Sequence, residues 1–284
     1  MDSQLNIAIQ GGPASFHDMA TREFFQGREL NLVPCDTFRQ LCQRLAREEV
    51  HYAVMAIENT LAGSILPNYT LLESHPVQII GEVYLHISQN LIGHPGTRIG
   101  DLQTVRSHPM ALMQCSDFLE SHPHLKGVET SDTAESAREL SLQPPNGVAV
   151  IASKRAAELY HLEIIAADIE NLKDNYTRFL VLSRQGNPHH PLQNKASLNF
   201  TLAHSVGSLA GALNIFGAHD LNMTLIQSVP IPRKPHEYAF HVDVVWEQRE
   251  NFEKAMRDLR QHTGELRILG IYQKGERPYD RQTR

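Results

Sequence analysis

What the 284-residue sequence lacks excludes several classes of protein. It has only three cysteines, Cys35, Cys42 and Cys115, and no Cys-x-x-Cys pair. An odd number at these spacings indicates reduced thiols rather than a disulfide framework or a zinc site. The formal net charge of −6 argues against nucleic acid as the main partner, because phosphate binding requires a basic face. Neither nucleotide motif, GxGxxG or GxxxxGK[ST], is present.

Long apolar runs and targeting segments are also missing. No run approaches the roughly 18 residues of a membrane span, and the first residues have neither the basic nor the apolar part of an export signal. The sixteen histidines are scattered without the spacing of metal ligands. We therefore expect a cytoplasmic protein that contacts neither membrane nor nucleic acid and uses no metal or organic cofactor.

The first two thirds of the chain alternates between strand and helix patterns. Apolar, β-branched runs such as 5–9, 51–57 and 148–151 are typical of strands. Ser15 is suited to cap the helix that follows the first run, and Asp132 with Glu135 has capping-box spacing for another helix. This alternation predicts an α/β domain with a mainly parallel sheet, in which ligands bind beyond the carboxyl ends of the strands.

Polar residues occur where such a sheet binds its ligands. Ser15, Glu58 with Asn59, Ser107 and Thr70 each follow a strand pattern and precede a helix. Taken singly, each is more often a helix cap than a ligand contact. Their shared placement favours a cleft lined with small hydrogen-bond donors and few cations, which suits a small polar anion.

One stretch, 175–179, concentrates the chemistry directly before the apolar run 180–182. Arg178 can bind a carboxylate through two parallel hydrogen bonds. Thr177 can donate a hydrogen bond to a departing oxygen. The spacing alone leaves another interpretation open, in which Arg178 forms a surface ion pair and Thr177 is a residue of high strand propensity.

A linker and a second module follow. Residues 185–194 contain two prolines and one glycine without periodicity, which is typical of a linker. Between 196 and 271 the patterns follow the order β-α-β-β-α-β. No nucleophile and base are paired in this module, so we expect it to regulate or to oligomerise.

Taken together, these motifs resemble the prephenate dehydratase family. The C-terminal module resembles the ACT domain of that family, and no chorismate mutase segment precedes Leu5, as in its monofunctional members. The motifs that carry the resemblance are Thr177-Arg178-Phe179 after an Asn, Ile57-Glu58-Asn59-Thr60 with Gly63, Ser107-His108-Pro109 with Gln114-Cys115, and the glycine-rich first turn.

The resemblance implies an architecture. Residues 1–184 would form a two-lobed catalytic domain like that of periplasmic binding proteins. One lobe would comprise about 1–79 and 165–183, and the other 80–164. Residues 185–195 would be the linker, and 196–284 a ferredoxin-like ACT domain through which the protein forms a homodimer or homotetramer.

The resemblance also implies a reaction. The family converts prephenate, a dianion, into phenylpyruvate for L-phenylalanine biosynthesis, losing water and carbon dioxide. Thr177 and Glu58 would be catalytic, with Thr177 polarising the leaving hydroxyl because a threonine is too weak an acid for full proton transfer. Glu58 would be paired, protonated or aimed at that hydroxyl. The implied substrate-binding residues are Arg178, Asn59, Ser107, Gln114, Thr70, Ser15, Asn175 and Phe179.

The sequence departs from the family pattern at some positions. Ala14 stands where the family often has Gly, His17 where it has Ser or Thr, and Met110 where it often has Gln. The Glu-Ser-Arg-Pro motif of the ACT domain is Gln227-Ser228-Val229-Pro230 here, without its charges. L-phenylalanine is still the implied effector. Its implied site comprises Gly207, Ser208, Leu209, Ala210, Asn222, Gln227, Ser228 and Pro230.

Two alternatives remain open. An arogenate dehydratase would carry the same motifs, because the sequence does not separate a keto from an amino side chain. A non-catalytic amino-acid sensor would also use a two-lobed cleft and an ACT domain. Thr177, Arg178, Glu58 and Gln114 favour the enzyme, since binding alone needs no donor beside a leaving group.

Overall fold

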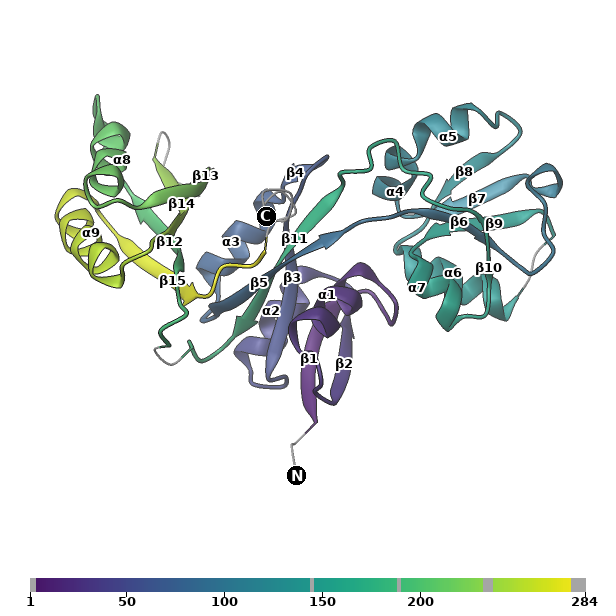
Figure 1. Ribbon diagram of the computed structural model, residues 1–284, viewed down its shortest axis with the longest axis horizontal. Helices are drawn as coiled ribbons and strands as arrows, with labels where there is room; N and C mark the ends of the chain where they lie inside the picture. Colours follow the sequence, from purple (N-terminus) through teal and green to yellow (C-terminus); the bar gives the residue numbers. More distant parts are fainter. Residues whose placement is uncertain (1–3, 144–145, 188–189, 232–236, 277–284) are drawn as a thin grey trace.

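The computed structural model describes residues 4–143, 146–187, 190–231 and 237–276. These residues form three β-sheets with their own helices, placed side by side along the long axis of the molecule (Figure 1). We call these parts the first lobe, the second lobe and the C-terminal module; the first lobe lies between the other two. The predicted linker leads into the C-terminal module, and its residues 188 and 189 lie outside the described ranges.

The first lobe is a mixed sheet in the order β2-β1-β3-β11-β5, with the short β4 also paired to β3. β1 is parallel to β2 and β3, whereas β11 runs antiparallel between β3 and β5. The prediction of a mainly parallel sheet is therefore wrong, because the chain leaves this sheet and returns in the opposite direction. The strands are β1 (Leu5–Gln10), β2 (Leu30–Cys35), β3 (Tyr52–Asn59), β4 (Gly63–Ser64), β5 (Gln78–His86) and β11 (Tyr176–Ser183).

Helices cover both faces of this sheet. On one face α1 (Phe16–Phe24) buries Ala20 against Ile7 and Ile9. On the other face α2 (Phe38–Ala46) and α3 (Leu66–Ser74) bury Leu41 and Leu72. The two faces of the first lobe are therefore separate environments, and a strand residue belongs to one or the other.

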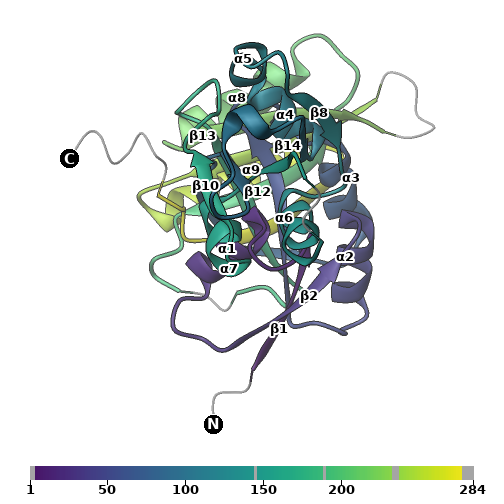
Figure 2. The ribbon, with the colours of Figure 1, turned by 90° about the vertical axis from the view of Figure 1, so that its right-hand side faces the viewer.

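The second lobe is a smaller mixed sheet in the order β10-β6-β9-β7-β8, which faces the viewer in Figure 2. The chain enters it after β5 and leaves it between β10 and β11. The predicted lobe boundary at 79 falls inside β5, which pairs with β11 from Gln78 to His86, so the first lobe extends further than predicted. The elements are β6 (Asn90–Gly93), η1 (Ile99–Asp101), β7 (Thr104–Ser107), α4 (Pro109–Gln114), α5 (Ser116–Glu120), β8 (Lys126–Glu129), α6 (Thr133–Leu142), β9 (Val148–Ala152), α7 (Lys154–Leu159) and β10 (Glu163–Ala166).

Local sequence signals set where two of these helices begin. The Ser15 hydroxyl accepts a hydrogen bond from the backbone N–H of Asp18 at 3.3 Å. The carboxylate of Asp132 accepts one from the N–H of Glu135 at 2.8 Å. Each satisfies a donor that has no partner within its own helix, and both predicted caps are confirmed.

The C-terminal module follows the predicted element order. Its antiparallel sheet has the order β13-β14-β12-β15, and α8 and α9 pack on it around Phe216 and Phe252. The elements are β12 (Lys195–Thr201), α8 (Ser208–Ala218), β13 (Asn222–Pro230), β14 (Tyr238–Val245), α9 (Arg249–His262) and β15 (Leu266–Tyr272).

The C-terminal module packs directly on the first lobe. Val229, Leu269 and Tyr272 join the core beneath α2 and α3. A Cβ at Gly270 would lie 2.1 Å from the carbonyl oxygen of Ile79, so the absence of a side chain there lets β15 approach the backbone of β5. The interface is thus part of the hydrophobic core and is closely fitted.

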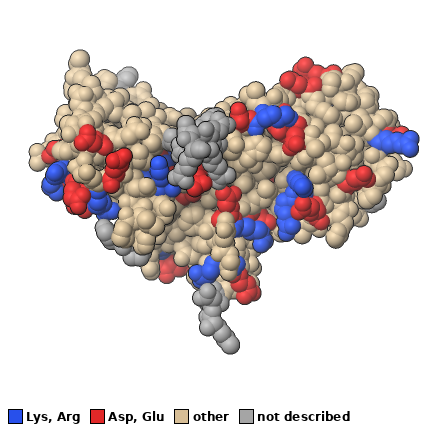
Figure 3. Space-filling view, in the orientation of Figure 1, with Lys and Arg blue, Asp and Glu red and all other residues tan. Residues whose placement is uncertain are grey.

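The surface agrees with the charge argument from the sequence. Lysine and arginine are interspersed with aspartate and glutamate over the face seen in Figure 3, without a continuous basic area on that face. Among the helices of the described ranges, none combines the length and the apolar character needed to cross a membrane.

Candidate active site

Thr177 lies at the start of β11, where the chain returns from the second lobe. It is paired in register with Asn59 at the end of β3, and both side chains are largely buried. The side-chain amide of Asn59 donates to the Thr177 hydroxyl oxygen at 2.9 Å and to the side-chain oxygen of Asn175 at 2.8 Å. Two strand ends and one chain crossing therefore place three predicted site residues together.

The orientation of the Asn59 amide is fixed by the backbone. Its side-chain oxygen accepts hydrogen bonds from the N–H groups of Leu61 and Ala62, both at 3.0 Å, so its NH₂ group must face Thr177. The Thr177 hydroxyl oxygen thus accepts from Asn59, and within the described part of the chain its own proton has no acceptor. That proton is free for a ligand, as the predicted donor role requires.

We expect Asn59→Asp to lower kcat by about 10–100-fold. A carboxylate would accept the Thr177 proton instead of donating to the hydroxyl oxygen, which turns the donor away from the substrate. Steady-state kinetics measures the effect, with Asn59→Ala as the control that removes the amide without supplying an acceptor. If Asn59→Asp is as active as the wild type, Asn59 does not orient Thr177.

The turn before α1 joins the two lobes. The Ser153 hydroxyl donates to the Ala14 carbonyl at 3.0 Å, and the Tyr160 hydroxyl donates to the Pro13 carbonyl at 3.2 Å. A Cβ at Gly11 would lie 2.7 Å from a carboxylate oxygen of Asp132. Because Ser153 caps α7 and Asp132 caps α6, the N-termini of both helices meet the turn that begins α1. The sequence identified Asp132 only as a cap and did not single out Ser153.

Ser15 is predominantly a helix cap in this structure. It is buried, and its hydroxyl oxygen accepts from the N–H of Asp18. The neighbouring Ala14 has a φ of +66°, in the left-handed region that glycine adopts more readily than alanine.

The two chain crossings between the lobes carry a second polar group. The side chain of Gln114, at the end of α4, accepts from the amide of Gln89 at 3.2 Å, and the Gln89 N–H donates to the Glu170 carboxylate at 2.8 Å. The side-chain oxygen of Gln89 and the side-chain nitrogen of Asn175 are buried and have no hydrogen-bond partner within the described ranges. Buried polar groups are normally paired, so a free acceptor and a free donor here suit a polar ligand. Gln89 and Glu170 have no local sequence signal.

Other predicted residues serve the lobes themselves. The Ser107 hydroxyl, fully buried, donates to the Ile151 carbonyl at 2.6 Å and so joins β7 to β9. Phe179 is a core residue whose ring meets that of His17 edge-on at 4.9 Å. Burial lowers the pKa of His17 to about 3, so this imidazole is neutral, and it accepts a hydrogen bond from the Ala56 N–H at 3.4 Å.

The structure does not bring Arg178 to the cleft, which corrects its predicted role as a substrate cation. Neighbouring residues of a strand point to opposite faces, and Arg178 faces α3 and the C-terminal module. Its side chain is 4% exposed and lies 2.7 Å from the Glu82 carboxylate and 2.5 Å from that of Asp243. Two anions already occupy this guanidinium, and the surface ion pair considered from the sequence is also wrong because the pairs are buried.

Glu58 and Thr70 lie on that same side. Glu58 is paired in register with Arg178, so its side chain points away from the face of Thr177. Thr70 is exposed on α3, the helix that packs against β13. Neither residue is joined to Thr177 in this structure, and the predicted catalytic role of Glu58 has no geometric support.

The paired carboxylates predict a dependence of stability on pH. Burial alone would raise the pKa of Glu82 and of Asp243, but Arg178 and Lys195 hold both below their ordinary values of 4.5 and 3.8. A carboxyl group whose pKa is lowered by folding stabilises the protein above its unfolded pKa, and this contribution is lost as the pH falls through the folded pKa.

We therefore expect the free energy of unfolding in urea to fall as the pH drops below about 6.5, because the buried His17 takes up a proton only in the unfolded chain. The fall should become steeper below about pH 4.5, where the paired carboxyl groups begin to take up protons. The control is Glu120→Gln, at an exposed carboxylate of α5, which should leave this profile unchanged. A free energy of unfolding that falls no more steeply below pH 4.5 than above it would show that the buried carboxylates are not ion-paired.

The residues of the predicted effector site lie at opposite ends of one helix. Gly207, with a φ of +83°, precedes α8, and Ser208, Leu209 and Ala210 begin it. Asn222 begins β13 just after α8 ends, about a helix length away, or roughly 16 Å for eleven residues. Gln227, Ser228 and Pro230 lie at the far end of β13. Within one copy of the chain, Asn222 therefore does not lie beside the start of α8.

Comparisons with known proteins agree with the motifs. The family model described as "Prephenate dehydratase" matches residues 7–187. The chain is 35% identical over 283 residues to "Arogenate dehydratase/prephenate dehydratase 2, chloroplastic" of Arabidopsis thaliana, covering 95% of this chain and 73% of that one. It is 36% identical over 279 residues to "Bifunctional chorismate mutase/prephenate dehydratase" of Aquifex aeolicus, covering 96% and 75%.

Solved structures resemble the whole chain. A prephenate dehydratase from Arthrobacter aurescens in complex with L-Phe matches with a TM-score of 0.85 and 25% identity, covering 97% of this chain and 91% of that one. A protein described as "GqqA- a novel type of quorum quenching acylases" matches with a TM-score of 0.85 and 28% identity, covering 96% and 99%. The similarity extends over both lobes and the C-terminal module.

Proposed function

This chain belongs to the prephenate dehydratase family, and we propose that the cleft beside Thr177 binds prephenate and converts it into phenylpyruvate. The single observation that carries this proposal is the Thr177 hydroxyl, which accepts from Asn59 and whose own proton has no acceptor among the residues that the structure describes. A group held in this way can donate to an oxygen that becomes more negative as the reaction proceeds.

The chemistry needs one proton and no redox partner. The C–O bond of the ring hydroxyl breaks together with the C–C bond that joins the ring to its carboxylate. The electron pair of this C–C bond completes the aromatic ring. Carbon dioxide leaves, and the departing hydroxide takes up a proton to become water. Thr177 stabilises the charge that develops on that oxygen, and aromatisation supplies the driving force.

The turn brings the caps of α1, α6 and α7 together between the lobes, namely Ser15, Asp132 and Ser153. A helix N-terminus favours an anion by roughly 0.3–2 kcal/mol. The carboxylates of Asp18 and Asp132 already take this place at α1 and α6, so the neutral Ser153 cap of α7 is the one that can attract a substrate anion. Asn59, Asn175, Gln114 and Ser15 remain the residues that we propose for substrate binding.

We infer that the C-terminal module is a ferredoxin-like ACT domain, following a catalytic domain over 1–184 and a linker over 185–195. The antiparallel order β13-β14-β12-β15 with two helices supports this, as does the L-Phe complex of a structural relative. We propose L-phenylalanine as the effector and a homodimer or homotetramer as the assembly. The distance between Asn222 and the start of α8 favours an effector site shared between copies.

The deciding experiment incubates the purified protein with prephenate and measures phenylpyruvate, with arogenate tested in parallel. Phenylpyruvate from the wild type establishes the proposed reaction, and faster conversion of arogenate to phenylalanine would identify the related activity instead. Folded protein that converts neither compound would support the amino-acid sensor. Repeating the assay with L-phenylalanine tests the effector.

A further inference from the structure

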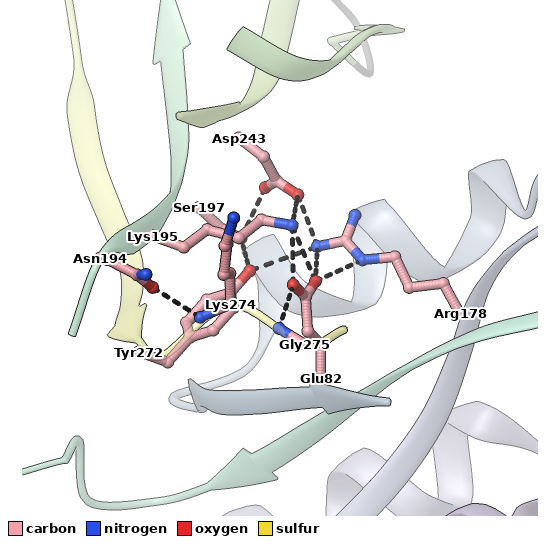
Figure 4. Close-up of polar contacts among 9 residues, drawn as sticks. All are labelled: Glu82, Arg178, Asn194, Lys195, Ser197, Asp243, Tyr272, Lys274 and Gly275. Carbon is pink, nitrogen blue, oxygen red and sulfur yellow. Dashed lines mark hydrogen bonds and ion pairs between the residues drawn. The ribbon is translucent and has the colours of Figure 1, made fainter. Parts of the chain in front are cut away.

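A buried group of four charges joins the first lobe to the C-terminal module (Figure 4). Glu82 on β5 and Arg178 on β11 belong to the first lobe, and Lys195 on β12 and Asp243 on β14 belong to the C-terminal module. None of the four side chains is more than 4% exposed. The two positive and two negative charges balance, and each part of the molecule supplies one of each.

The contacts cross the interface in both directions. Arg178 donates to the Glu82 carboxylate at 2.7 Å within the first lobe and lies 2.5 Å from Asp243 across the interface. Lys195 donates across the interface to both oxygens of Glu82 at 2.9 and 2.8 Å. Each part alone holds one ion pair, Arg178 with Glu82 or Lys195 with Asp243, and docking gives each charge a second partner across the interface.

A chain of hydroxyl groups closes this network. Ser197 donates its only proton to Asp243 at 2.6 Å, so in the 2.7 Å contact between Ser197 and Tyr272 the phenol must be the donor. The Tyr272 oxygen in turn accepts from Arg178 at 3.2 Å. The cavity beside Arg178, Ser197 and Asp243 has a volume of only about 10 Å³, room for about one water. Arg178 is thus held by Glu82, Asp243 and Tyr272.

Arg178 is also the chain neighbour of Thr177. The pairing of β11 with β3 is interrupted directly after Arg178, because Phe179 pairs with Ala56 and leaves Ile57 unpaired. The extra residue of this bulge lies on β3, so Thr177 and Arg178 lie together on a short segment of the β3–β11 ladder beyond it. The side chain of Arg178 anchors that segment.

We propose that Arg178 is a positioning residue for Thr177 and that the C-terminal module, through Asp243 and Tyr272, completes its anchor. This inference rests on the proposed dehydratase function. Arg178 is bound to Glu82 and Asp243 and does not touch the substrate. It holds the strand so that the Thr177 hydroxyl stays in contact with Asn59, and full turnover requires the C-terminal module to be docked.

The test uses Tyr272→Phe in the full-length protein, which removes one hydroxyl from the network and keeps all four charges. We expect kcat for prephenate to fall about 5–20-fold while KM changes less than about twofold, because the substrate contacts remain. The matched control is Glu73→Gln, which should leave kcat unchanged. Glu73 lies on α3, and its carboxylate is another charge at the interface, bound to His241 and Asn199 of the C-terminal module.

A double-mutant cycle separates positioning from a general loss of structure. In a Thr177→Val background, Tyr272→Phe should lower kcat less than about twofold, because the hydroxyl that it positions is gone. The same 5–20-fold loss in both backgrounds would overturn the proposal, as would a folded Tyr272→Phe protein with wild-type kcat.

A readout independent of activity keeps this inference distinct from the proposed function. Hydrogen exchange of the backbone amides in β11 should be faster in Tyr272→Phe than in the wild type and unchanged in Glu73→Gln. If the wild type does not convert prephenate, the proposed function fails while this measurement still tests the anchor. Unchanged exchange in Tyr272→Phe would refute the anchor. If Tyr272→Phe does not fold, Ser197→Ala, which interrupts the same chain of hydroxyl groups, replaces it in the kinetic, double-mutant and hydrogen-exchange experiments.

Discussion

Replacing Thr177 with valine is expected to lower kcat for prephenate by roughly 10²–10⁴-fold and to leave KM nearly unchanged. Valine has the shape of threonine but cannot donate a hydrogen bond. The Thr177 proton is free within the described residues, so the substitution removes a contact that strengthens as hydroxide departs. A group that acts mainly in the transition state affects kcat more than binding.

The control for this experiment is Thr177→Ser, which keeps the hydroxyl and loses only a methyl group. We expect it to retain most of the wild-type kcat, and circular dichroism of both variants verifies that they fold. Thr177→Val also leaves the Asn59 amide with one partner fewer, so its thermal stability is measured alongside. Wild-type turnover by Thr177→Val would remove Thr177 from the mechanism.

Replacing Gly270 with alanine is expected to destabilise the protein by more than about 3 kcal/mol. The added Cβ would lie 2.1 Å from the carbonyl oxygen and 2.8 Å from the carbonyl carbon of Ile79. These are backbone atoms of the neighbouring lobe, which cannot rotate away as a flexible side chain can. The strand β15 would have to move off β5 and open the buried interface.

Urea unfolding measures this loss, and Gly217→Ala provides a matched control. Gly217 lies within α8, where an added Cβ would meet no heavy atom within 4 Å, and alanine in a helix is favoured by up to about 1 kcal/mol. The same change from glycine to alanine should thus stabilise the protein at position 217 and destabilise it at position 270. If Gly270→Ala unfolds like the wild type, the close approach of β15 to β5 is not required.

Loss of docking in Gly270→Ala should also lower kcat if the C-terminal module completes the anchor of Arg178. A protein that keeps its catalytic lobes folded but loses this interface would lose the contact between Asp243 and Arg178. The two substitutions at the interface, Gly270→Ala and Tyr272→Phe, therefore act on Thr177 from different positions, one through the backbone and one through a hydroxyl.

The sequence by itself determined the features that depend on neighbouring residues. Ser15 and Asp132 cap their helices because a short side chain three residues before a free N–H reaches it whatever the rest of the chain does. The predicted strand run 148–151 forms β9, Val148–Ala152, because a short apolar, β-branched run is a local pattern. The clustered motifs also indicated the family, and the comparisons show it.

Only the tertiary structure decided which face each strand residue serves. The period of two in a strand implies that Thr177 and Arg178 cannot both point into one cleft. The sequence could not show which of them faces the C-terminal module, because that depends on how two distant sheets pack. The partners Glu82 and Asp243 lie 96 and 65 positions from Arg178 along the chain, and Gln89 meets Gln114 only through the chain crossings. Side-chain chemistry is local, whereas the pairing of buried charges is set by packing.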